Sequence, residues 1–281
     1  VAPMMKYTDS HYRVFMRQIC KRGLLYSEMI VANAINRSKK KNQLLDFNPI
    51  EHPIALQIGG DDPTLLGEAA KKGEDWGYDE INLNVGCPSP RVLSGNFGAC
   101  LMANPNHVAK CIDSMVKRTS IPITIKHRIG IDDLDNDELL IKFVDKIAES
   151  GATRFSIHAR KAWLNGLSPK ENRTIPPLQY DRVINLKKER PNLIIELNGG
   201  LRTPEECLNA LKTCDGAMVG RAAYSHPMRW KSIDEIIFGE EKRDLYASNI
   251  IENLIPYTEN HISNGGKIWD ICRHLVNLVE N

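Results

Sequence analysis

The chain has 281 residues, 42% of them hydrophobic and 26% charged, with a formal net charge of +2. This composition is ordinary for a soluble globular protein, and the length is enough to bury a large core. No apolar run reaches the roughly eighteen residues that a membrane span needs, so a membrane protein is not expected. The seven cysteines are scattered and include no CxxC pair. We therefore expect reduced thiols, no metal site and an intracellular, cytoplasmic location.

Short β-rich runs alternate with helical stretches over about the first 230 residues. The β-rich runs cover residues 1–4, 24–30, 54–60, 80–86, 123–129, 154–160, 193–200 and 216–222. Helical periodicity covers residues 61–76, 106–119, 137–150 and 203–213. Three of these helices start next to a proline, in Asp62-Pro63, Asn104-Pro105 and Thr203-Pro204. Eight strands in strict alternation with helices predict an α/β fold, a (β/α)8 TIM barrel over residues 1–230. The alternative is an open, doubly wound sheet.

The pattern becomes helical in residues 231–281, where residues 246–257 and 267–279 are the candidate helices. The second of these runs almost to the end of the sequence. We therefore expect a small C-terminal helical domain that is incomplete in this chain.

Six of the predicted strands end in polar residues. They are Gln57; Asn84 to Cys87; Lys126 to Arg128; His158 to Arg160; Asn198 to Gly200; and Gly220 with Arg221. In a (β/α)8 barrel the carboxyl ends of the strands surround the active site, so these residues are expected to meet there. A lone lysine or histidine is often a satisfied core residue. Six polar strand ends are hard to explain by packing, because each would cost free energy unless it were paired.

The last two strand ends have the composition of a phosphate site. Asn198-Gly199-Gly200 and Gly220-Arg221 combine glycines, which let backbone N–H groups approach a phosphate, with a charged donor. A pair of tight turns is the structural alternative. Lys126 and His158 would lie across the barrel mouth, where they could hydrogen-bond the polar edge of a flat cofactor. A phosphate together with a flat polar ring indicates flavin mononucleotide (FMN).

Two segments concentrate positive charge after predicted strands. The segment "NRSKKKNQ" carries Arg37, Lys39, Lys40 and Lys41, and the loop after the sixth strand carries Arg160, Lys161, Lys170 and Arg173. Such charges at the rim of the mouth would attract a polyanion, although lysine runs are often simply solvated. Trp163 in the second segment could stack on a base or anchor the loop. The acidic stretch at residues 131–137 is expected to avoid RNA.

Seven stretches together carry a family resemblance. They are "VAPMMKYTD", "ALQIGG", "INLNVGCPSPRVLSGNFGACLM", "ITIKHRIGIDD", "IHARKAWLNGLSPKENRTIPPL", "LNGGLRTPEE" and "GAMVGRAAY". In this order they resemble the tRNA-dihydrouridine synthases, and the "HARKAWLNGLSPKENR" loop is similar to that of the DusA subfamily. The resemblance runs from Val1 to about Met228. It implies an FMN-dependent oxidoreductase, recharged by NADPH, that reduces uridine to dihydrouridine in the D-loop of tRNA at positions 20 and 20a.

The resemblance also implies roles for individual residues. The FMN contacts would be Pro3, Met4, Met5, Gln57, Lys126, His158, Asn198, Gly199, Gly200, Gly220 and Arg221. Asn84, Lys170 and Arg173 would contact the RNA, and the C-terminal region would help to bind tRNA. Cys87 would be the proton donor. Its partner in the reaction would be a hydride that enters uracil at C6, while the thiol protonates C5 from the opposite face.

A thiol suits this role because its ordinary pKa, about 8.5, leaves it mostly protonated at neutral pH and still acidic enough to protonate an enolate. The cysteine should therefore remain a thiol, unlike a nucleophilic cysteine with a lowered pKa. The glycines between Gly95 and Gly98 fit a loop that closes over a flipped base. The structural alternative is that Cys87 is a small apolar residue at a strand end.

Three other classes of protein share part of this pattern. A small-molecule flavin enzyme of the dihydroorotate dehydrogenase kind would have the barrel and the phosphate site but would need neither the basic rim nor the helical tail. A lyase or aldolase could use Lys126 as a Schiff base and would need no flavin. A protein that only binds RNA would have no use for Lys126, His158 and Cys87 at one place.

Overall fold

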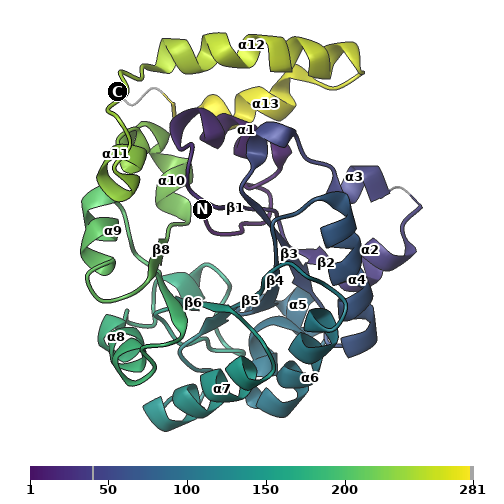
Figure 1. Cartoon of the computed structure of the whole chain (residues 1–281), viewed down its shortest axis with the longest axis vertical. Helices are drawn as coiled ribbons and strands as arrows, with labels where there is room; N and C mark the ends of the chain where they lie inside the picture. The colour runs from purple at the N-terminus through teal and green to yellow at the C-terminus, as the bar shows by residue number, and fades with distance from the viewer. Residues whose placement is uncertain (40, 279–281) are drawn as a thin grey trace.

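A ring of parallel strands surrounded by helices makes up most of the computed structural model, which describes residues 1–39 and 41–278 (Figure 1). The strands are β1 (Leu25–Tyr26), β2 (Ile30–Val31), β3 (Ile54–Gly59), β4 (Glu80–Val85), β5 (Ile123–Arg128), β6 (Arg154–His158), β7 (Ile194–Asn198) and β8 (Gly216–Met218). They pair in parallel in the order β1-β3-β4-β5-β6-β7-β8, and β2 also pairs with β3. The predicted (β/α)8 barrel is confirmed.

The helices lie around this ring. They are α1 (Ser10–Ile19), α2 (Ala32–Arg37), α3 (Lys41–Leu45), α4 (Pro63–Trp76), α5 (Pro90–Leu93), α6 (Pro105–Val116), α7 (Asp137–Glu149), α8 (Tyr180–Glu189), α9 (Pro204–Ala210), α10 (Arg221–Ser225), α11 (Ile233–Phe238), α12 (Ala247–Ser263) and α13 (Ile268–Leu275). Short 3-10 turns are η1 (Pro49–Glu51), η2 (Gly98–Ala103), η3 (Glu171–Arg173) and η4 (Pro227–Trp230). No helix in the described part of the chain is long and apolar enough to cross a membrane.

Capping side chains fix the starts of the helices that alternate with the strands. Asp62 accepts a hydrogen bond from the Leu65 backbone N–H (2.9 Å) at the start of α4. Asn104 does the same for α6 and Thr203 for α9. Each of these three caps is followed by proline at the first helical position, as the sequence predicts.

The first two predicted strands differ from the structure. Residues 1–4 form no regular strand, so that prediction is wrong. They bridge the gap between β8 and β1 instead: the Ala2 N–H donates to the Val219 carbonyl (2.7 Å) and the Val1 amino group donates to the Leu24 carbonyl (2.6 Å). Pro3 lacks an N–H and cannot continue a ladder. The predicted strand at 24–30 is divided into β1 and β2.

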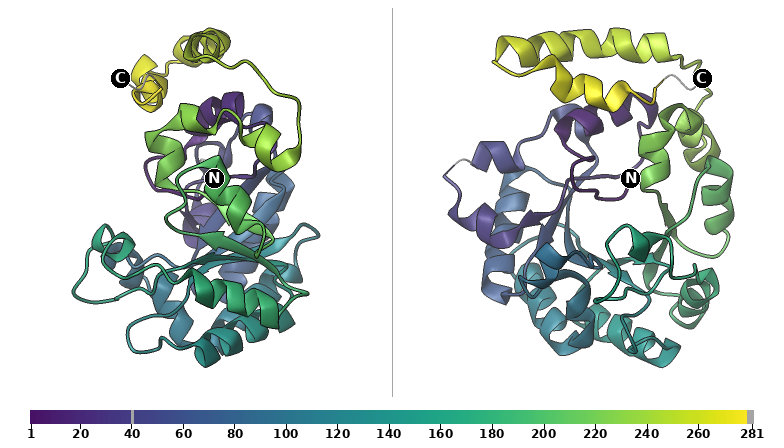
Figure 2. Two further views of the ribbon diagram at one scale, coloured as in Figure 1. Left: turned by 90° about the vertical axis from the view of Figure 1, so that its left-hand side faces the viewer. Right: turned by 180° about the vertical axis from the view of Figure 1, so that it is seen from behind.

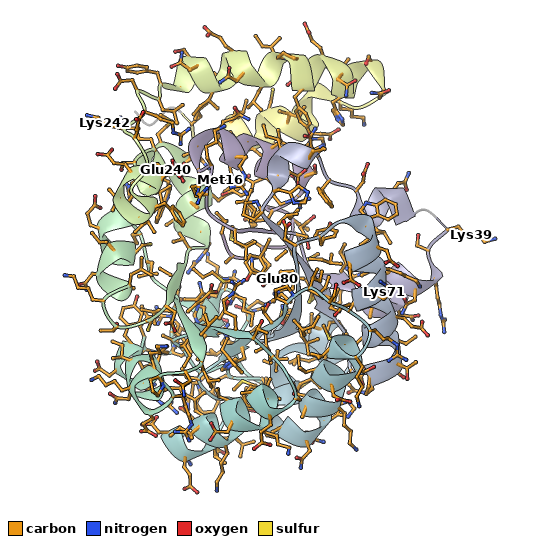
Figure 3. All side chains as sticks on the ribbon, in the orientation of Figure 1. Met16, Lys39, Lys71, Glu80, Glu240 and Lys242 are labelled. Atoms are coloured by element: carbon orange, nitrogen blue, oxygen red, sulfur yellow. The ribbon has the colours of Figure 1, made fainter. Side chains whose placement is uncertain are left out.

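Side chains alternate strictly between the inside of the barrel and the surrounding helices. In β4, Ile81, Leu83 and Val85 belong to the apolar core under the helices. The intervening Glu80 and Asn82 face the barrel interior, where the Gln57 side chain donates to Asn82 Oδ1 (2.8 Å). Figure 3 shows Glu80 near the middle of the ring. The period of two in the sequence therefore places the polar row of β4 inside the barrel.

The C-terminal helices pack on the barrel through α1. Ile250 and Leu254 of α12 share an apolar cluster with Tyr12, Phe15 and other residues of α1. Figure 2 shows α12 and α13 stacked beyond α1, at one side of the ring, in both views. The predicted helices at 246–257 and 267–279 are present as α12 and α13, although residues 279–281 lie outside the described part of the chain.

Candidate active site

Lys126, His158 and Asn198 form a row across three neighbouring strands. They lie near or at the carboxyl ends of β5, β6 and β7, and the sheet register pairs His158 with Asn198. The Lys126 ammonium donates to Asn198 Oδ1 (2.9 Å), and Asn198 Nδ2 donates to the Met218 carbonyl of β8 (2.7 Å). The structure thus brings together three predicted site residues from separate parts of the sequence.

The surroundings of Lys126 and His158 lower the pKa values of both side chains. Burial lowers the pKa of Lys126 to about 7, and the neighbouring Arg128 charge adds to this effect. Burial also moves the pKa of His158 well below its ordinary value, and the charges of Arg128, Lys126, Arg160 and Arg221 lower it further. His158 Nδ1 is buried without a hydrogen-bond partner among the described residues. A buried polar atom of this kind favours a bound group that the chain itself does not provide.

Gln57 and Asn84 lie between this row and Cys87, since the sheet register pairs Asn84 of β4 with Lys126 of β5. Asn84 Nδ2 donates to Gln57 Oε1 (2.9 Å). The other side-chain atom, Asn84 Oδ1, accepts from the backbone N–H groups of Gly86 (3.1 Å) and Cys87 (3.0 Å). Asn84 is itself buried. The described contacts therefore make Asn84 the residue that shapes the turn presenting Cys87.

The loop after β4 holds Cys87 half-exposed at the end of the barrel. Its carbonyl accepts from the Ala99 N–H (2.9 Å), and Sγ lies 3.5 Å from Ser89 Oγ. Gly98 allows this approach: its φ is +78°, and a Cβ there would lie 2.6 Å from the Cys87 carbonyl oxygen. Cys87 lies beyond the last residue of β4, Val85, and packs against the core cluster as a partly buried residue. It is therefore only partly accessible at this end of the barrel.

Five basic side chains surround the same end of the barrel. We call Lys126, Arg128, Arg160, Arg173 and Arg221 the cation group. Burial is the largest cause that lowers the pKa values of Lys126, Arg128, Arg160 and Arg173, and positive charges of other group members lower them further. This second effect shows that the members of the group lie close to one another. Within the described residues, no ion pair joins any member to a carboxylate. Uncompensated positive charge of this density attracts an anion.

Two glycine-containing turns, whose backbone is not covered by side chains of their own, adjoin the cation group. Gly199 and Gly200 have φ values of +112° and +77°, and a Cβ at Gly199 would lie 3.3 Å from the His158 ring. Gly220 is close to the N-terminal segment, since a Cβ there would lie 3.7 Å from Met4 Sδ. The structure therefore places the two predicted phosphate-binding turns, and the segment Pro3-Met4-Met5, around the same end of the barrel.

The loop after β6 is built around Asn172, which sequence reasoning did not identify. Its side chain donates to the Trp163 and Leu167 carbonyls (2.9 and 3.2 Å) and accepts from the Trp163 N–H (2.8 Å). Trp163 also has Lys161 Nζ 4.0 Å from its ring centroid. Lys170 is exposed on this loop, whereas Arg173 is half-buried and its carbonyl accepts from Arg221 (3.4 Å). Lys170 and Arg173 thus occupy different environments.

Arg128 connects this loop to the turn of Cys87. Its guanidinium is buried; Nε donates to the Gly86 carbonyl (3.1 Å), and one terminal nitrogen donates to the Asn172 (3.0 Å) and Lys161 (3.3 Å) carbonyls. The adjacent His127 points the opposite way, into the apolar layer against Phe143, and burial lowers its pKa to about 4. Successive side chains of a strand point to opposite faces of the sheet, so Arg128 belongs to the site and His127 to the core.

The basic segment after the second predicted strand does not line the site. Figure 3 shows Lys39 at the outer edge of the molecule, away from the middle of the ring. The reason is that α2 leads the chain outward from β2 to pack against α4. The prediction that this segment rims the mouth is wrong for Lys39. Lys40 lies outside the described residues.

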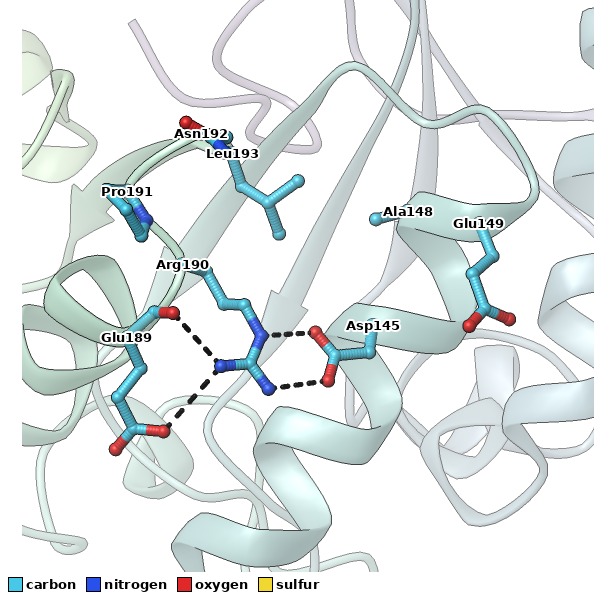
Figure 4. A pocket seen from close by; sticks show the side chains of 8 residues that line it. All are labelled: Asp145, Ala148, Glu149, Glu189, Arg190, Pro191, Asn192 and Leu193. Carbon is cyan, nitrogen blue, oxygen red and sulfur yellow. Dashed lines mark hydrogen bonds and ion pairs between the residues drawn. The ribbon is translucent and has the colours of Figure 1, made fainter.

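Two cavities in the described structure lie away from this end of the barrel. One, of about 360 Å³, lies between α7 and the loop after α8, where Arg190 binds both carboxylate oxygens of Asp145 (2.6 and 2.7 Å; Figure 4). The other, of about 460 Å³, is lined by Glu80, Arg154 and Glu196 near the amino ends of the strands. Barrel enzymes carry their active sites at the carboxyl ends, so neither cavity competes with the site described above.

A parallel barrel with a thiol, a lysine and a cation group at the carboxyl ends of its strands is the arrangement of a barrel enzyme. A comparison with known protein families identifies which kind of barrel enzyme this is: the model of the dihydrouridine synthase (Dus) family matches residues 1–281. The chain therefore belongs to the dihydrouridine synthase family and is an oxidoreductase.

Curated relatives of the same family match the chain over almost all its length. A Synechocystis protein named tRNA-dihydrouridine(20/20a) synthase is 54% identical over 99% of this chain and 83% of its own length. Proteins of the same name from Haemophilus ducreyi and Shewanella oneidensis are 50% and 48% identical over 100% of this chain, and over 86% and 83% of their own lengths. The family resemblance that the sequence motifs indicated is confirmed.

Proposed function

We propose that this protein reduces uridine to 5,6-dihydrouridine in the D-loop of tRNA, at positions 20 and 20a, with FMN as its cofactor and NADPH as the source of electrons. The observation that carries the proposal is the convergence of Cys87, Lys126 and the cation group at one end of the barrel. The names of the relatives support the substrate and the positions.

The residues at the site fit FMN. Gly199, Gly200 and Gly220 offer backbone without side chains, and Arg221 is the exposed cation beside them, so these four would hold the phosphate. Lys126 and the unpartnered Nδ1 of His158 are donors or acceptors for the polar edge of the ring, with Gln57 and Asn198 beside them. Pro3, Met4 and Met5 would complete the contacts. When bound, FMN would supply the hydride for C6 of the uracil.

The chain itself would supply the proton. Cys87 would donate it to C5 from the face opposite the hydride, and a neutral thiol can act as such a general acid. Asn84 would hold the turn of Cys87 in place through its two backbone hydrogen bonds (3.1 and 3.0 Å). Reduction then adds one hydride and one proton across the C5–C6 bond, which balances the reaction.

Residues 1–230 would form the catalytic barrel, and residues 231–281 would belong to a helical region that helps to bind tRNA. Exposed Lys170 would contact RNA phosphates beside the site, and Arg173 and Asn84, which are more buried, would contact the RNA nearer the reacting base. A uridine inside folded tRNA must leave its stack to reach Cys87 at the end of the barrel.

The direct test is chemical. The purified protein, with NADPH and an unmodified tRNA transcript, should convert the uridines at positions 20 and 20a, detected by mass spectrometry as a gain of two hydrogen atoms. Cys87→Ala should lower this rate by about 10²- to 10⁴-fold, as expected for loss of a general acid, and leave flavin content unchanged. The proposal would be rejected if the wild-type protein oxidised dihydroorotate, or reduced orotate-like small molecules, and left tRNA untouched.

The cofactor site is tested separately. Arg221→Glu should place a negative charge beside the phosphate and leave the protein colourless after purification. Arg229→Glu, a change of the same kind in η4, serves as the control and should leave the protein yellow. Full flavin content in Arg221→Glu would show that the phosphate binds elsewhere. A colourless wild-type protein that borohydride traps with substrate would favour a Schiff base at Lys126.

A further inference from the structure

Three potential metal ligands meet where the C-terminal helices pack on the barrel. His11 belongs to α1, His261 to the last turn of α12, and Asp270 to the first turn of α13. One nitrogen or oxygen from each lies within 4.8 Å of the others, and all three residues are half-buried. Figure 1 shows the three helices side by side. None of them takes part in the site at the carboxyl ends of the strands.

The distances in this cluster suit a tetrahedral ion. His261 Nε2 and Asp270 Oδ2 are 3.1 Å apart, and the rings of His11 and His261 lie 4.4 Å apart, centroid to centroid. Ligand atoms at about 2.0–2.2 Å from a tetrahedral Zn²⁺ are separated from each other by about 3.4 Å. The His261–Asp270 pair therefore needs almost no movement to share an ion, and His11 needs a small one.

The ligands are also oriented by their neighbours, as in metal sites. His11 Nδ1 lies 2.8 Å from the Tyr257 hydroxyl, which leaves Nε2 as the nitrogen for the ion. Asp270 Oδ2 accepts from the Lys267 N–H (3.0 Å), which fixes the carboxylate at the start of α13.

Gly266 makes the cluster sterically possible. A Cβ at this position would lie 2.2 Å from His261 Cε1 and Nε2. Only glycine lets the loop between α12 and α13 pass so close to the ring and return Asp270 to it. Sequence reasoning expected no metal, because it searched for closely spaced cysteines, whereas these ligands are separated by up to 259 positions, from residue 11 to residue 270.

We propose that His11, His261 and Asp270 bind one Zn²⁺ ion, with water as the fourth ligand, and that this ion fastens the C-terminal helices to α1. Two imidazoles and one carboxylate form a ligand set that zinc accepts. The ion would stabilise the packing of α12 and α13 on the barrel without taking part in the reaction.

The test is a zinc titration of the full chain after treatment with EDTA, followed by calorimetry and thermal unfolding. The wild-type protein should bind one tight equivalent, and its melting temperature should rise by a few degrees. His261→Gln and His11→Gln should each weaken binding at least about tenfold. His52→Gln is the matched control, because His52 also contacts a carboxylate, Asp79 (2.7 Å), yet no third potential ligand joins this pair among the described residues.

A readout on the wild-type protein guards against variants that fail to fold. Zinc should protect His11 and His261 from modification by diethyl pyrocarbonate and leave His52 reactive. The proposal is overturned if the wild-type protein shows no saturable zinc binding, if His261→Gln binds as tightly as His52→Gln, or if zinc gives no selective protection.

Discussion

At the scale of single residues, Arg128 connects the parts of the site most directly. It is a buried cation whose described acceptors are all backbone carbonyls: Gly86 next to Cys87, and Asn172 and Lys161 in the loop after β6. Burial lowers its pKa to about 10, so it remains charged at neutral pH. One side chain thus holds the turn of Cys87 against the loop that carries Lys170.

Arg128→Met should therefore separate these two loops. It removes three donated hydrogen bonds and leaves buried carbonyls without partners, so the free energy of unfolding should fall by about 1–3 kcal/mol. Dihydrouridine formation should fall while flavin content stays near wild type. Urea unfolding and single-turnover rates measure the two effects. Arg118→Met, which removes an exposed arginine of the outer helices, is the control. A variant with a normal rate on tRNA would show that Arg128 only supports the fold.

At the scale of elements, the sequence and the structure agree where side chains alternate. β3 to β7 fall within their predicted ranges because their apolar residues at every second position face the helices. The same alternation predicts the interior row that contains Lys126 and His158. The prediction of a strand at residues 1–4 was wrong because a strand needs hydrogen bonds to adjacent strands along its length, and Pro3 has no N–H to donate. The alternation of apolar and polar side chains within one segment does not show which other strands that segment pairs with.

The loops were less predictable than the strands. Arg128 donates to backbone carbonyls 33 to 44 positions away, whereas Asn172 donates to carbonyls of its own loop. No periodic pattern in the sequence indicates such contacts. The basic charge after β2 and that after β6 look alike as sequences. Only the direction of α2 in the structure shows that Lys39 lies away from the site, whereas Lys170 lies on the loop beside it.

This difference between the two basic segments predicts different effects on tRNA binding. Lys170→Glu should weaken binding and reduce the slope of log affinity against log salt by about one, because one phosphate contact is lost. Lys39→Glu changes the charge equally and should leave the slope unchanged. Filter binding at several salt concentrations measures both. Equal slopes for the two variants would remove the loop after β6 from the RNA footprint.

At the scale of the whole molecule, the C-terminal helices lie at one side of the barrel and contact the N-terminal segment and the chain after β8. Arg273 of α13 pairs with Asp9, and Asp9 also lies 2.9 Å from His274 Nε2. The Tyr224 hydroxyl, shortly after β8, donates to the Arg273 carbonyl (3.5 Å), and its ring contacts that of Tyr7. These contacts join α13 to the two segments that border the proposed phosphate site.

The central claim is that Cys87 gives a proton to the uracil, and its pH dependence tests this most directly. Dihydrouridine formation in a single turnover would be followed from about pH 6 to about pH 10, a range that spans the titration of ordinary thiols. Lys126, whose pKa burial lowers to about 7, loses its charge in the same range. Cys87→Ala retains Lys126, so the ratio of the wild-type rate to the Cys87→Ala rate isolates the thiol. We predict that this ratio falls as the pH rises, because the thiolate has no proton to give. A ratio that rises with pH would identify Cys87 as a nucleophile and contradict the account.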